Sequence, residues 1–120
     1  MIFSMVRLLA LLVALLLALT GFGGMLLAEN GLNGYLLLAH VGLGGAFLVL
    51  LVLFAMGGAG RTDARLAFWA FLVFGLGAGL TVLVSMFPLF GSEGQILLHT
   101  LHWSFALGAT VAGAALAVRC

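Results

Sequence analysis

The sequence is very poor in charged side chains. Only 6% of its 120 residues are charged, and they comprise four arginines and three acidic residues, with no lysine. A soluble domain has about a quarter of its residues charged, whereas 66% of this chain is apolar. A soluble surface is therefore excluded, and we predict an integral membrane protein whose main partner is the lipid bilayer.

Basic patches and cysteine pairs are lacking as well. The formal net charge is only +1, which argues against a nucleic acid partner because such binding requires a basic face. The single cysteine, Cys120, provides neither a disulfide framework nor a Cys/His metal cluster. We also find no nucleophile, acid/base pair or nucleotide-binding loop. No catalytic residue is predicted, and the composition favours a non-catalytic subunit over a free-standing enzyme.

Four apolar stretches are long enough to cross the hydrocarbon layer, which requires about 20 residues. They cover residues 8–28, 35–56, 66–87 and 95–118, and the glycine-rich segments between them are short enough to make neighbouring helices antiparallel. The runs are continuous and rich in Leu and Ala, unlike the alternating strands of a membrane barrel. The sequence predicts an all-α, transmembrane, four-helix, up-down-up-down bundle. It forms one domain over residues 1–120, and we find no internal repeat.

The charged residues predict the orientation of these helices. If the helices alternate, all four arginines lie at one membrane face and two glutamates lie at the other. The arginines are Arg7, Arg61, Arg65 and Arg119, and the glutamates are Glu29 and Glu93. Cytoplasmic loops carry the excess of arginine and lysine, so we expect both termini to be cytoplasmic and the two glutamate-bearing loops to be external.

The three histidines fall in the external half of this topology. His40 lies near the external end of the span 35–56, while His99 and His102 lie near the external end of the span 95–118. At 1.5 Å per residue their depths are about 8, 6 and 10 Å. These two spans run in the same direction, so the histidines are expected to form one layer across the bundle.

Small residues occur at about the same depth in the membrane as the histidines. Gly21 and Gly24 lie in the first span, and Gly44 lies one turn below His40. Together they would leave room for a flat ring, and histidine nitrogen is the usual axial ligand of haem iron in such a site. We therefore expect one b-type haem, with these glycines lining its site and His40 and His102 as iron ligands. His99 stays open as the alternative ligand, or as a partner for a haem propionate or a quinone.

With this histidine pattern the sequence resembles the small four-helix b-type cytochromes of bacterial membranes, which are similar in plan to the haem-bearing half of cytochrome b. The segment Phe87–His102, FPLFGSEGQILLHTLH, carries the local resemblance, and in that family a histidine in the position of His102 is a ligand. The family often has a second histidine pair deeper in the membrane. Here Leu53 or Phe54 and Ala115 or Leu116 occupy those positions, which implies a single haem.

The resemblance also implies a function and a location. Such a protein is a subunit of a respiratory-chain complex in the bacterial inner (cytoplasmic) membrane. It would pass electrons between quinone or quinol and an external redox partner, such as a multihaem c-type cytochrome or an iron-sulfur protein.

Other functions remain open. A haem-free membrane anchor or scaffold subunit, or a membrane protein that binds a pigment or an ion through histidine, would have the same span pattern. A small multidrug exporter is less consistent with the sequence because it needs a carboxylate inside the membrane. Glu29, Asp63 and Glu93 all fall in the predicted loops.

Overall fold

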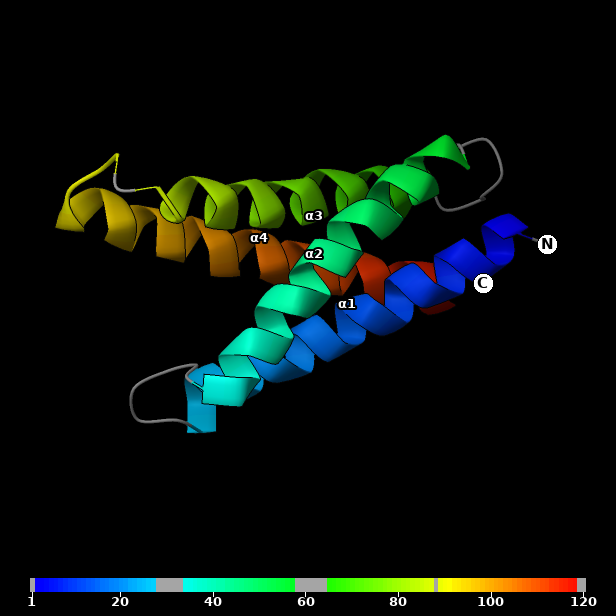
Figure 1. The fold of residues 1–120 in the computed structure, drawn as a ribbon. Helices are drawn as coiled ribbons and strands as arrows, with labels where there is room; N and C mark the ends of the chain where they lie inside the picture. The colour runs from blue at the N-terminus through cyan, green and yellow to red at the C-terminus, as the bar shows by residue number, and fades with distance from the viewer. Residues whose placement is uncertain (1, 28–33, 58–64, 88, 119–120) are drawn as a thin grey trace. The chain divides into compact units, whose positions relative to one another are not determined.

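The computed structural model describes residues 2–27, 34–57, 65–87 and 89–118. Four helices make up almost all of these residues: α1 (Ile2–Leu27), α2 (Gly34–Met56), α3 (Arg65–Ser85) and α4 (Ser92–Val118) (Figure 1). Each helix is long and apolar enough to cross a membrane, and none of the described residues forms a β-strand. The predicted all-α fold of four membrane-length helices is therefore confirmed.

The helices differ from the predicted spans by one or two residues at several ends, such as Ser85 at the end of α3, and by more at the starts of α1 and α4. Helix α1 already begins at Ile2, because the residues before the predicted span continue its apolar run and include Arg7, a good helix former. Helix α4 begins at Ser92 rather than Gln95 and has Glu93 in its first turn. A carboxylate is favourable beside the positive end of the helix dipole, which explains why three residues of the predicted loop are helical.

The chain divides into two compact units, Met1–Arg61 and Thr62–Cys120. In the first unit α1 packs against α2, and in the second α3 packs against α4 (Figure 1). Each unit is a helical hairpin, since a short connection joins two helices that lie side by side. In an antiparallel pair, residues at similar sequence distances from the turn lie opposite each other. This rule determines which side chains can meet within each hairpin.

Reciprocal contacts between phenylalanine and glycine hold α3 against α4. A Cβ atom added to Gly77 would lie 3.0 Å from Phe105, and one added to Gly108 would lie 2.9 Å from Phe74. The two rings are neighbours, with centroids 6.2 Å apart. Each helix thus inserts an aromatic ring over a glycine of the other, the close approach that small residues permit in membrane helices.

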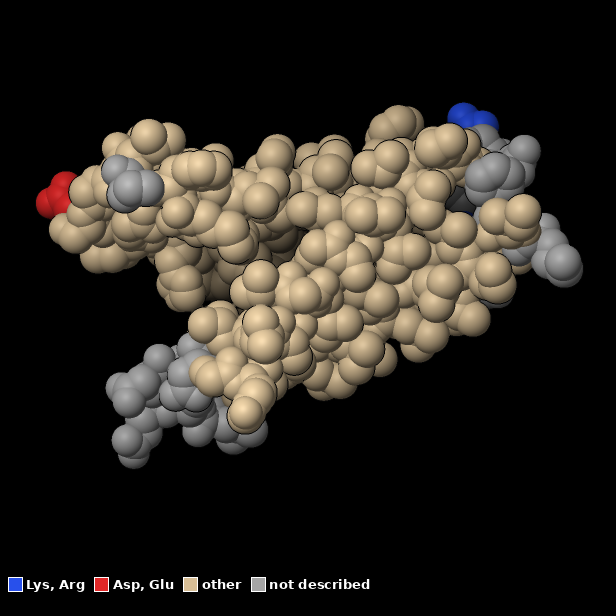
Figure 2. Space-filling view, in the orientation of Figure 1, with Lys and Arg blue, Asp and Glu red and all other residues tan. Residues whose placement is uncertain are grey.

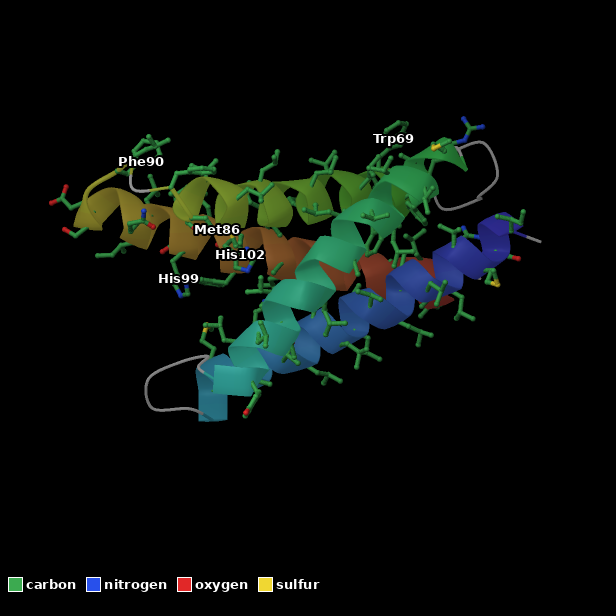
Figure 3. The ribbon with its side chains drawn as sticks, viewed as in Figure 1. Trp69, Met86, Phe90, His99 and His102 are labelled. Atoms are coloured by element: carbon green, nitrogen blue, oxygen red, sulfur yellow. The ribbon has the colours of Figure 1, made fainter. Side chains whose placement is uncertain are left out.

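The outer surface suits a bilayer. Figure 2 shows charged side chains only at the extremities of the visible face, with uncharged residues between them. In the second hairpin, Arg65 begins α3 and Glu93 lies in the first turn of α4, so the two charges are at opposite ends. Trp69 projects from α3 near the Arg65 end and is 53% exposed (Figure 3). Charge at the ends and an exposed tryptophan near one of them are typical of membrane helices.

The glycine contacts make a prediction about stability. We expect Gly108→Ala to destabilise the protein by about 1–3 kcal/mol, because its new methyl group would overlap the base of the Phe74 ring and overpack the interface. Gly45→Ala is the control, since a Cβ there meets nothing within 4 Å. Loss of helical circular dichroism during denaturation in detergent measures both variants. Equal stability of the two would show that Phe74 does not require glycine at position 108.

Candidate functional site

His40 is held by the neighbouring helix of its own hairpin. Its Nδ1 atom lies 2.8 Å from Oγ1 of Thr20, which is on α1. The Thr20 hydroxyl also lies 2.8 Å from the carbonyl of Leu16 and 3.2 Å from the carbonyl of Leu17. Because a hydroxyl has one hydrogen, the roles in the Thr20–His40 bond depend on the histidine tautomer. When the hydrogen is donated to a carbonyl of α1, Oγ1 accepts Nδ1–H of His40.

His102 is held in a similar way in the second hairpin. Its Nδ1 atom lies 2.8 Å from the carbonyl oxygen of Ala78 on α3, and a carbonyl can only accept. Oγ1 of Thr81 lies 3.5 Å from the same nitrogen and donates its own hydrogen to the Ala78 carbonyl at 2.8 Å. Nδ1–H of His102 is thus the donor, with the carbonyl as its near acceptor and the hydroxyl further away.

The carbonyl partner makes Nδ1 of His102 a donor, and the Thr20 contact is compatible with the same arrangement at His40. In a neutral imidazole with the proton on Nδ1, the lone pair is on Nε2. A histidine that binds a metal through Nε2 commonly donates its other ring N–H to a carbonyl, carboxylate or water, which fixes the ring and increases its basicity. His102 therefore has the Nδ1–H donor that such a ligand requires, and His40 has a partner at Nδ1 that can accept one.

His99 lacks this arrangement. It is exposed and lies on the same side of α4 as His102 (Figure 3). Among the described residues, none makes a hydrogen bond with its ring. Of the three predicted histidines, the structure thus orients His40 and His102 through a neighbouring helix and leaves His99 at the surface. This contrast favours His102 over His99 as a ligand.

The three predicted glycines have different surroundings. A Cβ atom on Gly21 would lie 2.9 Å from Cε1 of His40, so this glycine makes room for the imidazole itself. A Cβ on Gly44 would meet nothing within 4 Å, while Gly24 is buried. Gly21 is therefore a contact of the histidine, and Gly44 has open space beside it, one turn along α2 from His40.

The histidine positions can be compared along their helices. His40 lies six residues after the start of α2, about 9 Å along the axis. His99 and His102 lie seven and ten residues after the start of α4, about 10 and 15 Å along it. The α4 values exceed the predicted depths because the helix begins three residues earlier. Its first turn, Ser92–Gly94, is polar and suits the interfacial region better than the hydrocarbon.

The two threonines were not identified from the sequence. Thr20 lies seven residues before the end of α1 and His40 lies six residues after the start of α2, so similar distances from the turn are a signal for the first pair. Thr81 lies four residues before the end of α3, whereas His102 lies ten residues after the start of α4, so counting from the helix ends does not identify the second pair.

Comparison of the chain with protein-family models, characterised proteins and solved structures finds no match. Within the described ranges no three His, Cys, Asp or Glu side chains come together in a way that could hold a metal ion. A bis-histidine haem needs only two such ligands. Several expected features lie outside the described residues, among them the loop around Glu29, Asp63, Pro88 and Cys120.

The contact between Gly21 and His40 can be tested directly. Gly21→Ala should displace the imidazole and weaken its bond to Thr20, because the methyl carbon would lie 2.9 Å from the ring. Gly23→Ala on the same helix is the matched control, since its Cβ meets nothing within 4 Å. We expect the imidazole 15N NMR shifts of His40 to change only in Gly21→Ala. Unchanged shifts in that variant would contradict the observed ring position.

Proposed function

We propose that this chain is a membrane b-type cytochrome subunit in which His40 and His102 supply the two axial imidazoles of one haem b. The observation that carries the proposal is a contact shared by the two histidines, since Nδ1 of each lies 2.8 Å from an oxygen of the preceding helix. A packing histidine can use either ring nitrogen as its donor. An iron ligand that binds through Nε2 must keep its proton on Nδ1.

The surroundings of the histidines are compatible with such a group. Gly44 leaves open space on α2 close to His40, and the residues flanking both histidines are mostly apolar. The four helices lack acidic residues except for Glu93, which lies at the end of α4. Two neutral nitrogen ligands with little nearby charge suit haem better than a free divalent cation, because such a cation would require carboxylate ligands to balance its charge.

The bound haem would supply one-electron transfer, and the protein would supply orientation and environment. Thr20 and the Ala78 carbonyl keep the proton of each imidazole on Nδ1 and restrict rotation of the ring. The apolar helices limit the access of water, which is one of the properties that set the potential of a haem. The residues of the chain thus perform binding and tuning, and no residue is assigned a catalytic role.

We further propose that electrons enter and leave at the end of the second hairpin that carries Glu93. Exposed Phe90, just before α4, and exposed His99 on α4 lie toward this end, where a quinone head group or an external redox subunit would approach. In this proposal the arginine-bearing ends are cytoplasmic, and the protein lies in a bacterial inner membrane.

Replacement of single histidines tests the ligand assignment. We expect His40→Leu and His102→Leu each to abolish the split absorption of low-spin haem in reduced membranes, because each variant lacks one axial nitrogen. His99→Leu is the matched control on the same face of α4 and should retain the spectrum. Difference spectra of dithionite-reduced against oxidised membranes measure all three variants.

Two results would contradict the assignment. Loss of the spectrum in His99→Leu, with retention in His102→Leu, would make His99 the ligand. A wild-type protein without any haem spectrum would instead support a haem-free anchor. Immunoblots of the membrane fraction must show equal amounts of each variant, so that loss of haem is distinguished from loss of protein.

A further inference from the structure

The two hairpins hold their histidines through chemically different acceptors. In the second hairpin, the near acceptor for His102 is a backbone carbonyl, at 2.8 Å, and the Thr81 hydroxyl is at 3.5 Å. In the first hairpin, the partner of His40 Nδ1 is a side-chain hydroxyl, that of Thr20, at 2.8 Å. A side-chain substitution can therefore remove the acceptor of one histidine while leaving that of the other in place.

The Thr20 hydroxyl is well fixed for this task. Its hydrogen is directed to carbonyls of its own helix, at 2.8 Å for Leu16 and 3.2 Å for Leu17. In this arrangement a lone pair of the hydroxyl oxygen can accept Nδ1–H of His40. The neighbouring residue, Gly21, allows the imidazole to approach this close to α1. Two adjacent residues of α1 thus place one ring.

We propose that Thr20 is the positioning residue that sets the ligand strength of His40, and with it the redox potential and affinity of the haem. This inference rests on the proposed function. An acceptor at Nδ1–H draws the proton toward itself and makes Nε2 a stronger electron donor. A stronger donor favours the ferric state, so loss of the acceptor raises the potential.

Thr20→Val provides the test, because valine has nearly the shape of threonine and lacks the hydroxyl. We expect a haem affinity about 10- to 100-fold lower, the usual effect of removing such an outer partner, and a midpoint potential above that of the wild type. Thr20→Ser restores an acceptor and should return both values toward wild type. Thr81→Val is the control in the second hairpin and should have a smaller effect, since the Ala78 carbonyl remains.

A measurement without haem separates the positioning role from the ligand role. In the apoprotein, 15N NMR should show His40 as the Nδ1–H tautomer in the wild type and as a mixture of tautomers in Thr20→Val. His102 should remain Nδ1–H in both proteins. These shifts report the hydrogen bond directly and do not depend on activity.

The outcomes are distinguishable. Wild-type affinity, potential and tautomer in Thr20→Val would overturn this inference and leave the proposed function intact. An equal effect of Thr81→Val would overturn the proposed difference between the hairpins. If the wild-type protein binds no haem, the proposed function and the ligand role of His40 both fail, and the tautomer comparison still decides whether Thr20 positions the ring.

Discussion

Within each hairpin, a hydrogen bond at Nδ1 connects a histidine on the second helix to an oxygen on the first. In a membrane interior a polar ring without such a partner is costly, and the partner also decides which nitrogen carries the proton. His40 uses the hydroxyl of Thr20 and His102 uses the carbonyl of Ala78. The same bond therefore satisfies the imidazole, links the two helices and prepares Nε2 as a donor.

The close approach of the helices makes this bond possible. Gly21 leaves room for the His40 ring beside α1, while Gly77 and Gly108 admit the phenylalanine rings that hold α3 to α4. Helices separated by larger side chains could not place an imidazole within hydrogen-bonding distance of an oxygen on the neighbouring helix. Glycine at these positions thus contributes to the site indirectly, by setting the distance between the helices.

The fold was largely predictable from the sequence and the site only in part. Continuous apolar runs specify four membrane helices, because backbone polar groups in lipid must be satisfied within the helix. The histidines were identifiable because polar residues are rare in such runs. Thr20 and Thr81 cannot be identified in this way, because a threonine in a membrane helix can satisfy its hydroxyl by donating to a carbonyl of its own helix. Their role depends on helix rotation and on the length of each turn, which composition does not specify.

Titration of the purified protein with haem tests the central claim most directly. We predict saturation at one haem per chain, with the split reduced spectrum of a low-spin bis-imidazole iron. Replacing both His40 and His102 with leucine should eliminate this saturable binding while all four helices remain. Binding that does not saturate, or the same titration curve for the double variant, would contradict the assignment of these two histidines as haem ligands.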